Sequence, residues 1–325
     1  MLIDLHPPPA DLRRLVIEGM ERRPRQLPAW LLYDDEGSRL FEAICAQPEY
    51  SLTRTETALL EQAAAEQAAA LGPGVVVEFG AGNARKVGPL LTALAPAGYV
   101  ALDISADQLE RACGELQARH PLLKVLGICC DYTALEALPA VPLLQQRRLG
   151  FYPGSSLGNF SPAEARRLLG QVRRLLAPDG ALLIGIDQPK PVARLEAAYN
   201  DAAGISAAFA RNLLVRLNRD LEGDFDPTAF AYRAWWDAPH SRITMALESR
   251  RAQRVRLAGR CWPFAAGEVL ITEHSVKYTV AAFRELALAA GWRPLRRWHD
   301  PADDLSLHLL VQADSGETVS GDAEE

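Results

Sequence analysis

The amino-acid sequence predicts an α/β fold built around an open, mostly parallel β-sheet. Strand-like and helix-like segments alternate between positions 75 and 187, which is the pattern of parallel strands joined by crossover helices. The first strand is a run of β-branched residues that closes on Glu78 and on a turn with Gly80 and Gly82, as expected where backbone passes close to a ligand. We expect strands at 75–79, 99–104, 124–129, 149–152 and 181–186.

One helix start marks the edge of this sheet where a ligand is expected. Ser161 fits an N-cap, Pro162 fits the first helical position, and Glu164 fits the partner of Ser161 in a capping box. The preceding loop, 153–160, then lies at the carboxyl end of a strand. Because open α/β sheets bind ligands at that edge, we expect this loop to contribute to the site.

An acidic residue at the end of the second strand indicates what the glycine turn binds. Asp103 lies 23 positions after Gly80, about the spacing at which such sheets present a carboxylate to ribose hydroxyls. A dinucleotide-binding sequence would place a third glycine where this chain has Arg85. The pattern favours S-adenosylmethionine, which has no phosphate to bind, over NAD; a glycine turn without a ligand is a third interpretation.

Three further side chains are candidates for contacts with this cofactor. Asp131 follows the third strand, where methyltransferases place an acceptor for the adenine amino group, and Tyr132 would lie beside the ring. Lys86 could pair with the methionyl carboxylate, although it could also be an ordinary surface lysine. The sequence thus predicts a class I, Rossmann-like methyltransferase sheet that binds S-adenosylmethionine through Gly80, Gly82, Lys86, Asp103, Asp131 and Tyr132.

Beyond Asp187 the pattern changes and predicts a second, α+β domain. Helical segments at 193–199 and 206–221 precede segments typical of antiparallel strands, at 230–237, 242–250, 253–257 and 269–278. A helix at 280–290 and a strand at 306–311 resume the first pattern, and an alanine-rich stretch at 58–71 predicts a scaffold helix. We expect a cofactor domain from 54–190 and 277–313, a substrate domain from 1–53 and 191–276, and a disordered acidic tail at 314–325.

Composition limits the partners and the compartment of the protein. A net charge of −6 and a pI near 5.6 argue against nucleic acid, whose partners usually present a basic face. No apolar run approaches the roughly 18 residues of a membrane span, and the N-terminus does not resemble a signal peptide. The five cysteines and six histidines show no metal-ligand spacing. We expect a cytoplasmic monomer without a metal.

Two polar groups are candidates for holding the substrate. The amide of Asn159, in the loop before Ser161, can donate to a carboxylate while it accepts from an amine, although asparagine in a glycine loop is often a turn residue. In the strand predicted around 269–278, Glu273 and Ser275 share one face. A carboxylate and a hydroxyl on one face could hold the two nitrogens of an imidazole; a solvent-facing strand edge is the alternative.

Several blocks spread over nearly the whole chain carry a further signal. They include Gly154 to Phe160, Ala198 to Gly204 and Thr272 to Ser275, together with 33–42, 48–56, 217–219 and 241–245. Taken in their order along the chain, these blocks resemble the family of histidine Nα-methyltransferases of ergothioneine biosynthesis, which trimethylate the α-amino group of histidine to hercynine. Ser51-Leu52 and Asp187-Gln188-Pro189 depart from the family pattern.

The resemblance implies roles for individual residues. Tyr50, Glu273 and Ser275 would surround the imidazole of L-histidine, with Phe41 and Met245 closing that pocket. Asn159 and Tyr199 would hold the carboxylate and the amine, with Gly154 and Tyr33 near the amine. Tyr33 and Asn159 would thus be the residues closest to the chemistry.

Other functions remain as alternatives at this point. A related enzyme could methylate the amine of a tryptophan-derived or other aromatic amino acid. Indole has one donor and no second ring nitrogen, so a buried Glu273 would gain less from it than from imidazole. A nicotinamide oxidoreductase is disfavoured by Arg85, and a binding protein that kept only the fold would be expected to lose part of the polar set.

Overall fold

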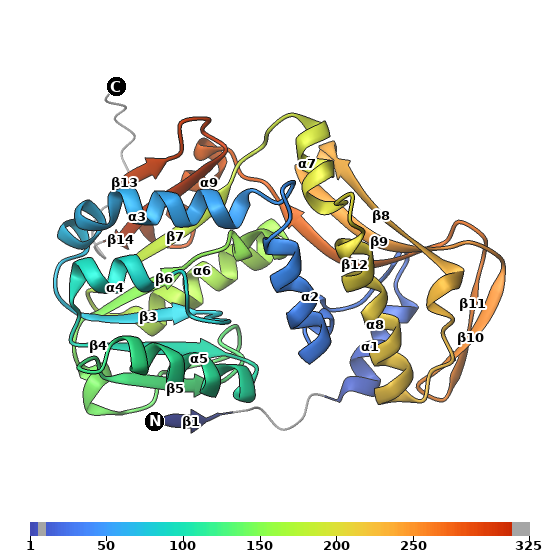
Figure 1. Ribbon diagram of the computed structural model, residues 1–325, viewed down its shortest axis with the longest axis horizontal. Coiled ribbons are helices and arrows are strands. Elements are labelled where there is room, and N and C mark those ends of the chain that lie inside the picture. The colour runs from blue at the N-terminus through green and yellow to red at the C-terminus, as the bar shows by residue number, and fades with distance from the viewer. Residues whose placement is uncertain (6–10, 314–325) are drawn as a thin grey trace.

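The protein is described by a computed structural model that covers residues 1–5 and 11–313 (Figure 1). Its larger sheet has eight strands in the order β1 (Leu2–Asp4), β5 (Val125–Cys129), β4 (Gly98–Asp103), β3 (Val75–Phe79), β6 (Arg148–Tyr152), β7 (Ala181–Asp187), β14 (Leu305–Gln312) and β13 (Trp292–His299). The first six strands are parallel, whereas β14 runs antiparallel to both of its neighbours. This is the open, mostly parallel sheet that the sequence predicts.

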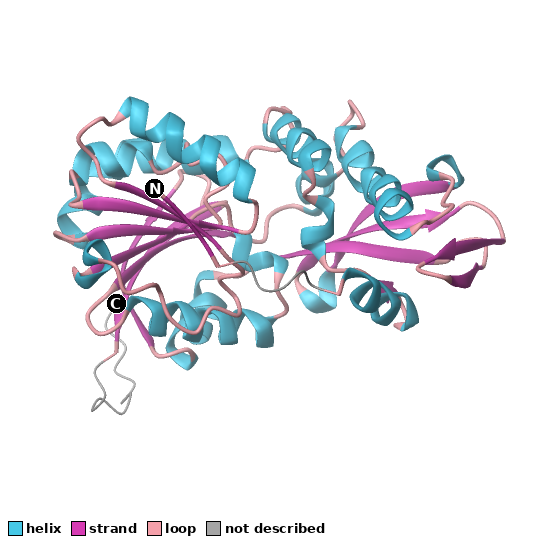
Figure 2. Cartoon of the chain, turned by 90° about the horizontal axis from the view of Figure 1, so that it is seen from below, coloured by secondary structure: helices cyan, strands magenta, loops and turns pink. Residues whose placement is uncertain are grey.

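Helices cover both faces of the larger sheet (Figure 2). Val76 packs in a cluster with residues of α3 (Leu52–Leu71), α4 (Gly88–Leu94) and α5 (Ala106–Arg119). Its neighbours Val75 and Val77 pack in another cluster with residues of α6 (Pro162–Leu176) and α9 (Val280–Ala289). Because both faces are buried, the central strands are apolar throughout rather than alternating.

The predicted capping box at the start of α6 is confirmed. The Ser161 hydroxyl accepts from the backbone N–H of Glu164, and the Glu164 carboxylate accepts from the backbone N–H of Ser161. Helix α3 begins at Leu52, earlier than the alanine-rich stretch indicates, and α9 ends at Ala289 as the backbone turns through Gly291 with φ +82°.

A smaller sheet forms the second part of the molecule (Figure 1). Its strands are β2 (Arg25–Gln26), β12 (Val269–Val276), β9 (Arg242–Ser249) and β8 (Phe230–Asp237), beside the hairpin of β10 (Gln253–Leu257) and β11 (Arg260–Phe264). The helices of this part are α1 (Leu12–Glu21), α2 (Asp35–Cys45), α7 (Val192–Tyr199) and α8 (Ile205–Leu221). Short 3-10 helices occupy Ala29–Leu32 (η1), Pro142–Gln145 (η2), Ser156–Asn159 (η3), Pro227–Ala229 (η4) and Ala238–His240 (η5).

The chain leaves the larger sheet after β7 and returns to it after β12. The segments that follow these two strands are in contact. Strand β12 ends at Val276, two residues before the predicted end, because Lys277 N–H donates to the Ser241 carbonyl and Tyr278 N–H to the Asp187 carbonyl. A salt bridge between Lys277 Nζ and Asp187 Oδ2, 2.6 Å apart, closes the junction.

Some elements were not apparent from the sequence pattern. Strand β13 carries Pro294 and several arginines, and its pairing with β14 shifts register between Pro294 and Arg296, which disturbs a period-2 pattern. Strand β1 adds to the edge of the larger sheet, so the first residues of segment 1–53 lie with the cofactor sheet. The tail expected to be disordered, 314–325, lies outside the described residues. Within the described ranges, no helix has the length and apolar character needed to cross a membrane.

Candidate active site

The glycine turn after β3 lies at the carboxyl end of the parallel strands. Gly80 and Gly82 have φ of +71° and +54°, in the left-handed region that favours glycine. Gly80 N–H donates to the Leu102 carbonyl, which ties the turn to β4. A β-carbon added at Gly80 would approach the Tyr132 hydroxyl at 3.6 Å, so turn and tyrosine enclose the same space.

Asp103 ends β4 beside this turn. Its Oδ2 accepts from Gly82 N–H at 2.8 Å, and its Oδ1 accepts from Ser105 N–H at 3.1 Å. Burial raises the pKa of the Asp103 carboxyl, although these backbone donors act to lower it. The carboxylate is therefore held in place by the backbone, with acceptor capacity left for ribose hydroxyls.

Asp131 and Tyr132 follow β5 at the same edge. Asp131 Oδ1 accepts from the Thr133 backbone and hydroxyl, at 2.9 and 2.6 Å, which fixes a turn. The Tyr132 ring lies edge-on to Phe79, with centroids 5.8 Å apart, and its hydroxyl is 3.4 Å from that of Tyr152. An aromatic wall thus stands beside an acidic acceptor, as an adenine site requires.

Lys86 belongs to a buried polar contact that sequence reasoning did not anticipate. Its Nζ lies 2.7 Å from Glu56 Oε2, and the fully buried Glu56 carboxylate also accepts from Gly154 N–H at 2.7 Å. A β-carbon at Gly154 would lie 3.4 Å from Lys86 Nζ. Lys86 and the 153–160 loop are therefore joined through Glu56, and the Lys86 ammonium has further donors for an incoming carboxylate.

These residues fit S-adenosylmethionine. The edge offers carboxylates for hydroxyl and amino donors, an aromatic wall, and a lysine for a carboxylate. The turn that would cradle a pyrophosphate in a dinucleotide site has Arg85 in place of the third glycine.

The loop that carries Asn159 packs against the smaller sheet. Residues of η3 contact β12, and a β-carbon on Gly158 would come within 2.6 Å of the Val276 carbonyl oxygen. Asn159 ends η3 and is exposed, whereas Gly158 and Leu157 are buried. The contact therefore brings an exposed amide of the larger sheet next to the strand that carries Glu273 and Ser275.

Glu273 is buried on β12 opposite Met245. The two residues pair across β12 and β9, next to an irregularity between Ile271 and Glu273. Burial raises the pKa of Glu273 to about 8, whereas the charge of Lys277 acts in the opposite direction. No described residue donates a hydrogen bond to this carboxylate, so a ligand donor would relieve a costly burial. His274 points away from it and contacts Thr244 Oγ1 at 3.1 Å.

Ser275 and Tyr199 form a pair of hydroxyls near Glu273. Their oxygens are 2.8 Å apart, and Lys277 Nζ lies 2.8 Å from Ser275 Oγ and 2.6 Å from the Tyr199 hydroxyl. Although burial opposes its ionisation, Lys277 and Lys190 hold the pKa of the Asp187 carboxyl below its ordinary value. The same network raises the pKa of Lys277 despite its burial, so its ammonium stays charged.

Aromatic rings connect the predicted substrate residues. Tyr50 is edge-on to Tyr199 at 6.0 Å between centroids and to Phe41 at 6.4 Å, and Phe41 is edge-on to Tyr33 at 5.5 Å. Burial raises the pKa of the Tyr33 phenol well above its ordinary value, and the charge of Glu273 raises it further. Tyr33 therefore stays a neutral phenol at physiological pH and lies within the electrostatic reach of Glu273.

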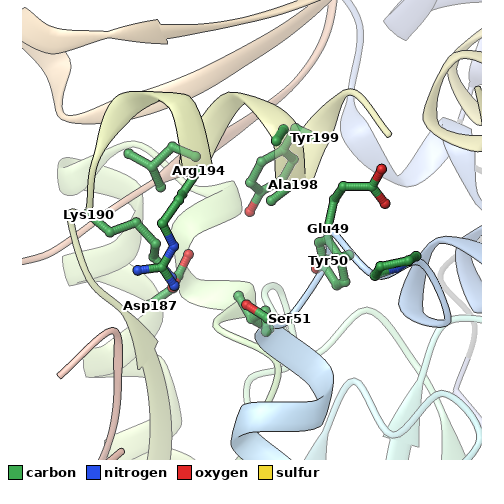
Figure 3. Close-up of a pocket in the computed structure, with 12 residues that line it drawn as sticks. Glu49, Tyr50, Ser51, Asp187, Lys190, Arg194, Ala198 and Tyr199 are labelled. Atoms are coloured by element: carbon green, nitrogen blue, oxygen red, sulfur yellow. The ribbon is translucent and has the colours of Figure 1, made fainter. Parts of the chain in front are cut away.

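A cavity of about 280 Å³ lies beside this cluster, at the start of α3 and along α7. Figure 3 shows Asp187, Lys190 and Arg194 on one side of it and Glu49 and Tyr50 on the other. Tyr50 and Tyr199 line the cavity, whereas Glu273, Ser275 and Met245 do not. The cavity adjoins the side chains of Glu273 and Ser275 through the contact between Tyr199 and Ser275.

The structure thus brings two sets of predicted residues to neighbouring places and adds members to both. The cofactor set lies along the carboxyl edge of the larger sheet, and the substrate set lies where β12, α7 and the N-terminal segment meet it. Sequence reasoning missed Glu56, Asp187 and Lys277 as parts of this site. Glu56 lies in the block 48–56, Lys277 lies in the strand predicted at 269–278, and Asp187 was noted as a departure from the family pattern. Glu56 and Gly154, like Asp187 and Lys277, are far apart in sequence.

Comparison with known proteins places the chain in a family. It is 39% identical over 307 residues to the histidine N-alpha-methyltransferase of Mycolicibacterium smegmatis, across 93% of this chain and 95% of that protein. Identity is 36% to the protein of that name from Mycobacterium tuberculosis, with the same coverage. It is 31% to ergothioneine biosynthesis protein 1 of Neurospora crassa, across 93% of this chain and 36% of that protein. A family model described as histidine-specific methyltransferase, SAM-dependent, matches residues 12–312, and the chain therefore belongs to that family.

Proposed function

We propose that the protein transfers methyl groups from S-adenosylmethionine to the α-amino group of L-histidine and makes the trimethylated betaine hercynine, in ergothioneine biosynthesis. The names of the similar proteins support this substrate. The observation that carries it is the buried Glu273 carboxylate without a described donor, on the same strand face as Ser275. Such a pair matches a ring with two nitrogens.

Imidazole would be preferred because other rings would leave Glu273 or Ser275 without a hydrogen-bond partner. A site that buries polar groups rejects ligands that cannot pair with them, because each unpaired group costs roughly 1–3 kcal/mol. Indole offers one ring N–H and no ring acceptor, so it would satisfy Glu273 or Ser275 but not both. Phe41, Tyr50 and Met245 would cover the faces of the imidazole.

The chemistry requires an unprotonated amine in line with an activated methyl group, which S-adenosylmethionine supplies when bound. Orientation lowers much of the barrier to such a displacement. Asn159 would hold the α-carboxylate, and Tyr199 the amine. Since the pKa of Tyr33 is raised, its neutral phenol would accept a hydrogen bond from the amine and direct the lone pair rather than remove a proton.

Three successive methylations are possible if the enzyme binds histidine through its ring and its carboxylate. The amine can turn while both ends of the histidine stay bound, and nearby tyrosine faces favour the growing cationic charge. Mass spectrometry of histidine incubated with the enzyme and S-adenosylmethionine tests this, and the trimethylated product is expected. Accumulation of monomethyl histidine would contradict repeated transfer, and methyl transfer to tryptophan in preference to histidine would contradict the substrate.

We also propose that cofactor and substrate bind to different parts of the chain, as the sequence indicated. Segments 54–190 and 277–313 would bind the cofactor, and segments 1–53 and 191–276 would bind the substrate. The separate sheets support this division, apart from β1, which belongs to the larger sheet.

A further inference from the structure

A buried lysine stands behind the hydroxyl pair of Ser275 and Tyr199. The Lys277 ammonium donates to the Tyr199 hydroxyl at 2.6 Å and to Ser275 Oγ at 2.8 Å. It also lies 2.6 Å from Asp187 Oδ2. An ammonium has three donors and no acceptor, so every donor of Lys277 has a partner within the protein. Lys277 therefore reaches the substrate only through the hydroxyls.

The lysine limits how the two hydroxyls can bond. They lie 2.8 Å apart, so one of them donates to the other, and each also accepts from Lys277. Two hydroxyls have two protons, and neither can donate to an ammonium. One proton of the pair is used between them, and the other is available to a group outside the pair. Without the lysine, that second proton could turn into the space that the ammonium occupies.

We propose that Lys277 is a positioning residue that makes Ser275 donate to the unprotonated ring nitrogen of the substrate and so selects one tautomer of a neutral imidazole. This inference rests on the proposed function. Tyr199 then donates to Ser275 and retains a lone pair for the substrate amine. Glu273 accepts from the other ring nitrogen.

The electrostatics of the pocket agree with this direction. Burial raises the pKa of Glu273 to about 8 although the charge of Lys277 opposes that rise, so the N–H of a bound ring would bring the carboxyl to its ionised form. An ionised carboxylate can only accept, so the ring N–H faces Glu273 and the ring lone pair faces Ser275. Lys277 thus acts on both groups that would bind the ring, through its hydrogen bond to Ser275 and through the charge that opposes the pKa rise of Glu273.

The wild-type enzyme tests the donor directly with ring analogues of histidine. Pyrrol-2-yl-alanine and pyrrol-3-yl-alanine each keep one ring N–H and lack the second nitrogen. If Ser275 must donate, kcat/KM for the better of these analogues is about 100-fold or more below that for histidine. A better analogue within about threefold of histidine would overturn the proposal. Failure to methylate histidine at all would instead overturn the proposed function.

Variants then test whether Lys277 is the cause of the preference for histidine over the pyrrole analogues. Asp187→Asn with Lys277→Met removes the buried charge pair together, so neither charge is left unpaired. In this double variant the preference for histidine over the pyrrole analogue should fall about tenfold or more. Lys190→Met is the matched control, because Lys190 binds the other oxygen of Asp187 and its Nζ is not bonded to either hydroxyl. It should keep the preference within about threefold, as should Asp187→Asn.

A mutant cycle that combines the hydroxyl variants with the double variant distinguishes a positioning role of Lys277 from a general loss of structure. Ser275→Ala should remove most of the preference, and adding the double variant should change it less than about twofold further. Tyr199→Phe should keep the preference, since Ser275 still accepts from Lys277 and donates outward. A preference unchanged in the double variant, or lost equally in Lys190→Met, would contradict the role of Lys277. If the double variant does not fold, the contrast between Ser275→Ala and Tyr199→Phe decides.

Discussion

At the residue scale, the proposed site depends on the carboxylate of Glu273, which is buried even when no substrate is bound. Glu273 is 9% exposed and its pKa is raised by burial to about 8. Groups with strongly shifted pKa in a pocket are typical of functional sites, because evolution removes such costs elsewhere. A substrate N–H would stabilise the ionised form.

Replacing Glu273 by Ala should weaken the use of histidine. Loss of the acceptor for the ring N–H should lower kcat/KM by about 30-fold or more, equivalent to roughly 2 kcal/mol. Steady-state methyl transfer measures this. His274→Ala is the control, because that side chain is on the opposite face of the strand and contacts Thr244. Equal kcat/KM values for the wild type and the Glu273 variant would contradict the assignment.

Glu273 should also make the ligand-free protein less stable as pH rises. Between pH 4.5 and about 8 the folded state binds a proton that the unfolded state releases, so the free energy of unfolding falls with pH and then levels off. Glu273→Gln should therefore stabilise the protein more at pH 9 than at pH 5, with an upper bound of roughly 5 kcal/mol at about 1.4 kcal/mol per pKa unit. Urea denaturation at the two pH values measures this, and a stabilisation independent of pH would speak against it.

Individual residues differed in how far the sequence revealed them. Alternation along one strand was enough to place Glu273 and Ser275 on the same face, and the spacing from Gly80 indicated Asp103. Glu56 and Lys277 also have partners far away along the chain, such as Gly154 for Glu56 with a separation of 98 and Tyr199 for Lys277 with a separation of 78. A pattern of neighbouring residues along the chain cannot predict contacts between such distant positions.

At the scale of elements, the contact of η3 with β12 joins the cofactor edge to the substrate pocket. Gly158 makes the approach possible, since any side chain there would meet the Val276 carbonyl at 2.6 Å. A displaced η3 would move Asn159 away from β12 while the glycine turn after β3 stays in place.

Gly158→Ala should therefore raise KM for histidine about tenfold or more and leave the affinity for S-adenosylmethionine within about threefold, since the overlap must be relieved by moving backbone. Calorimetry with the cofactor and kinetics with histidine separate these effects. Gly170→Ala in α6 is the matched control, because its nearest neighbour would be an Arg174 atom at 4.0 Å. Equal losses of both affinities would show that Gly158 does not act on the substrate side.

Elements with strong local signals were predicted well from the sequence. The capping box of α6 and the apolar central strands β3, β4 and β7 depend on neighbours along the chain. Strands β1 and β2 are short and are defined by their partners β5 and β12, so little in their own sequence marks them. Strand β13 is obscured by its proline and its register shift.

At the scale of the whole molecule, one buried ion pair joins the two chain crossings between the sheets. Asp187 ends β7 and Lys277 follows β12, and both are almost completely buried. The pair therefore holds together the parts that would bind cofactor and substrate. The sequence indicated the insertion and its ends, but not the bond that closes it.

Lys277→Met should lower the free energy of unfolding by about 3–5 kcal/mol, because the buried Asp187 carboxylate would lose its fully buried partner. Asp187→Asn combined with Lys277→Met should lose less, since no buried carboxylate is left without Lys277 and the charge that loses its partner is that of Lys190, whose side chain is 10% exposed. Urea denaturation of the three proteins at pH 7 measures both values. A loss below about 1 kcal/mol for Lys277→Met would mean that the pair does not hold the junction.

The central claim is that histidine lies between the two sheets with its imidazole against Glu273 and Ser275. A crystal structure with L-histidine and S-adenosylhomocysteine tests it most directly. We expect one ring nitrogen within hydrogen-bond distance of the Glu273 carboxylate, the other within hydrogen-bond distance of Ser275 Oγ, and the α-amino nitrogen facing the cofactor sulfur. A ring bound elsewhere, with the Glu273 carboxylate unpaired, would contradict the account.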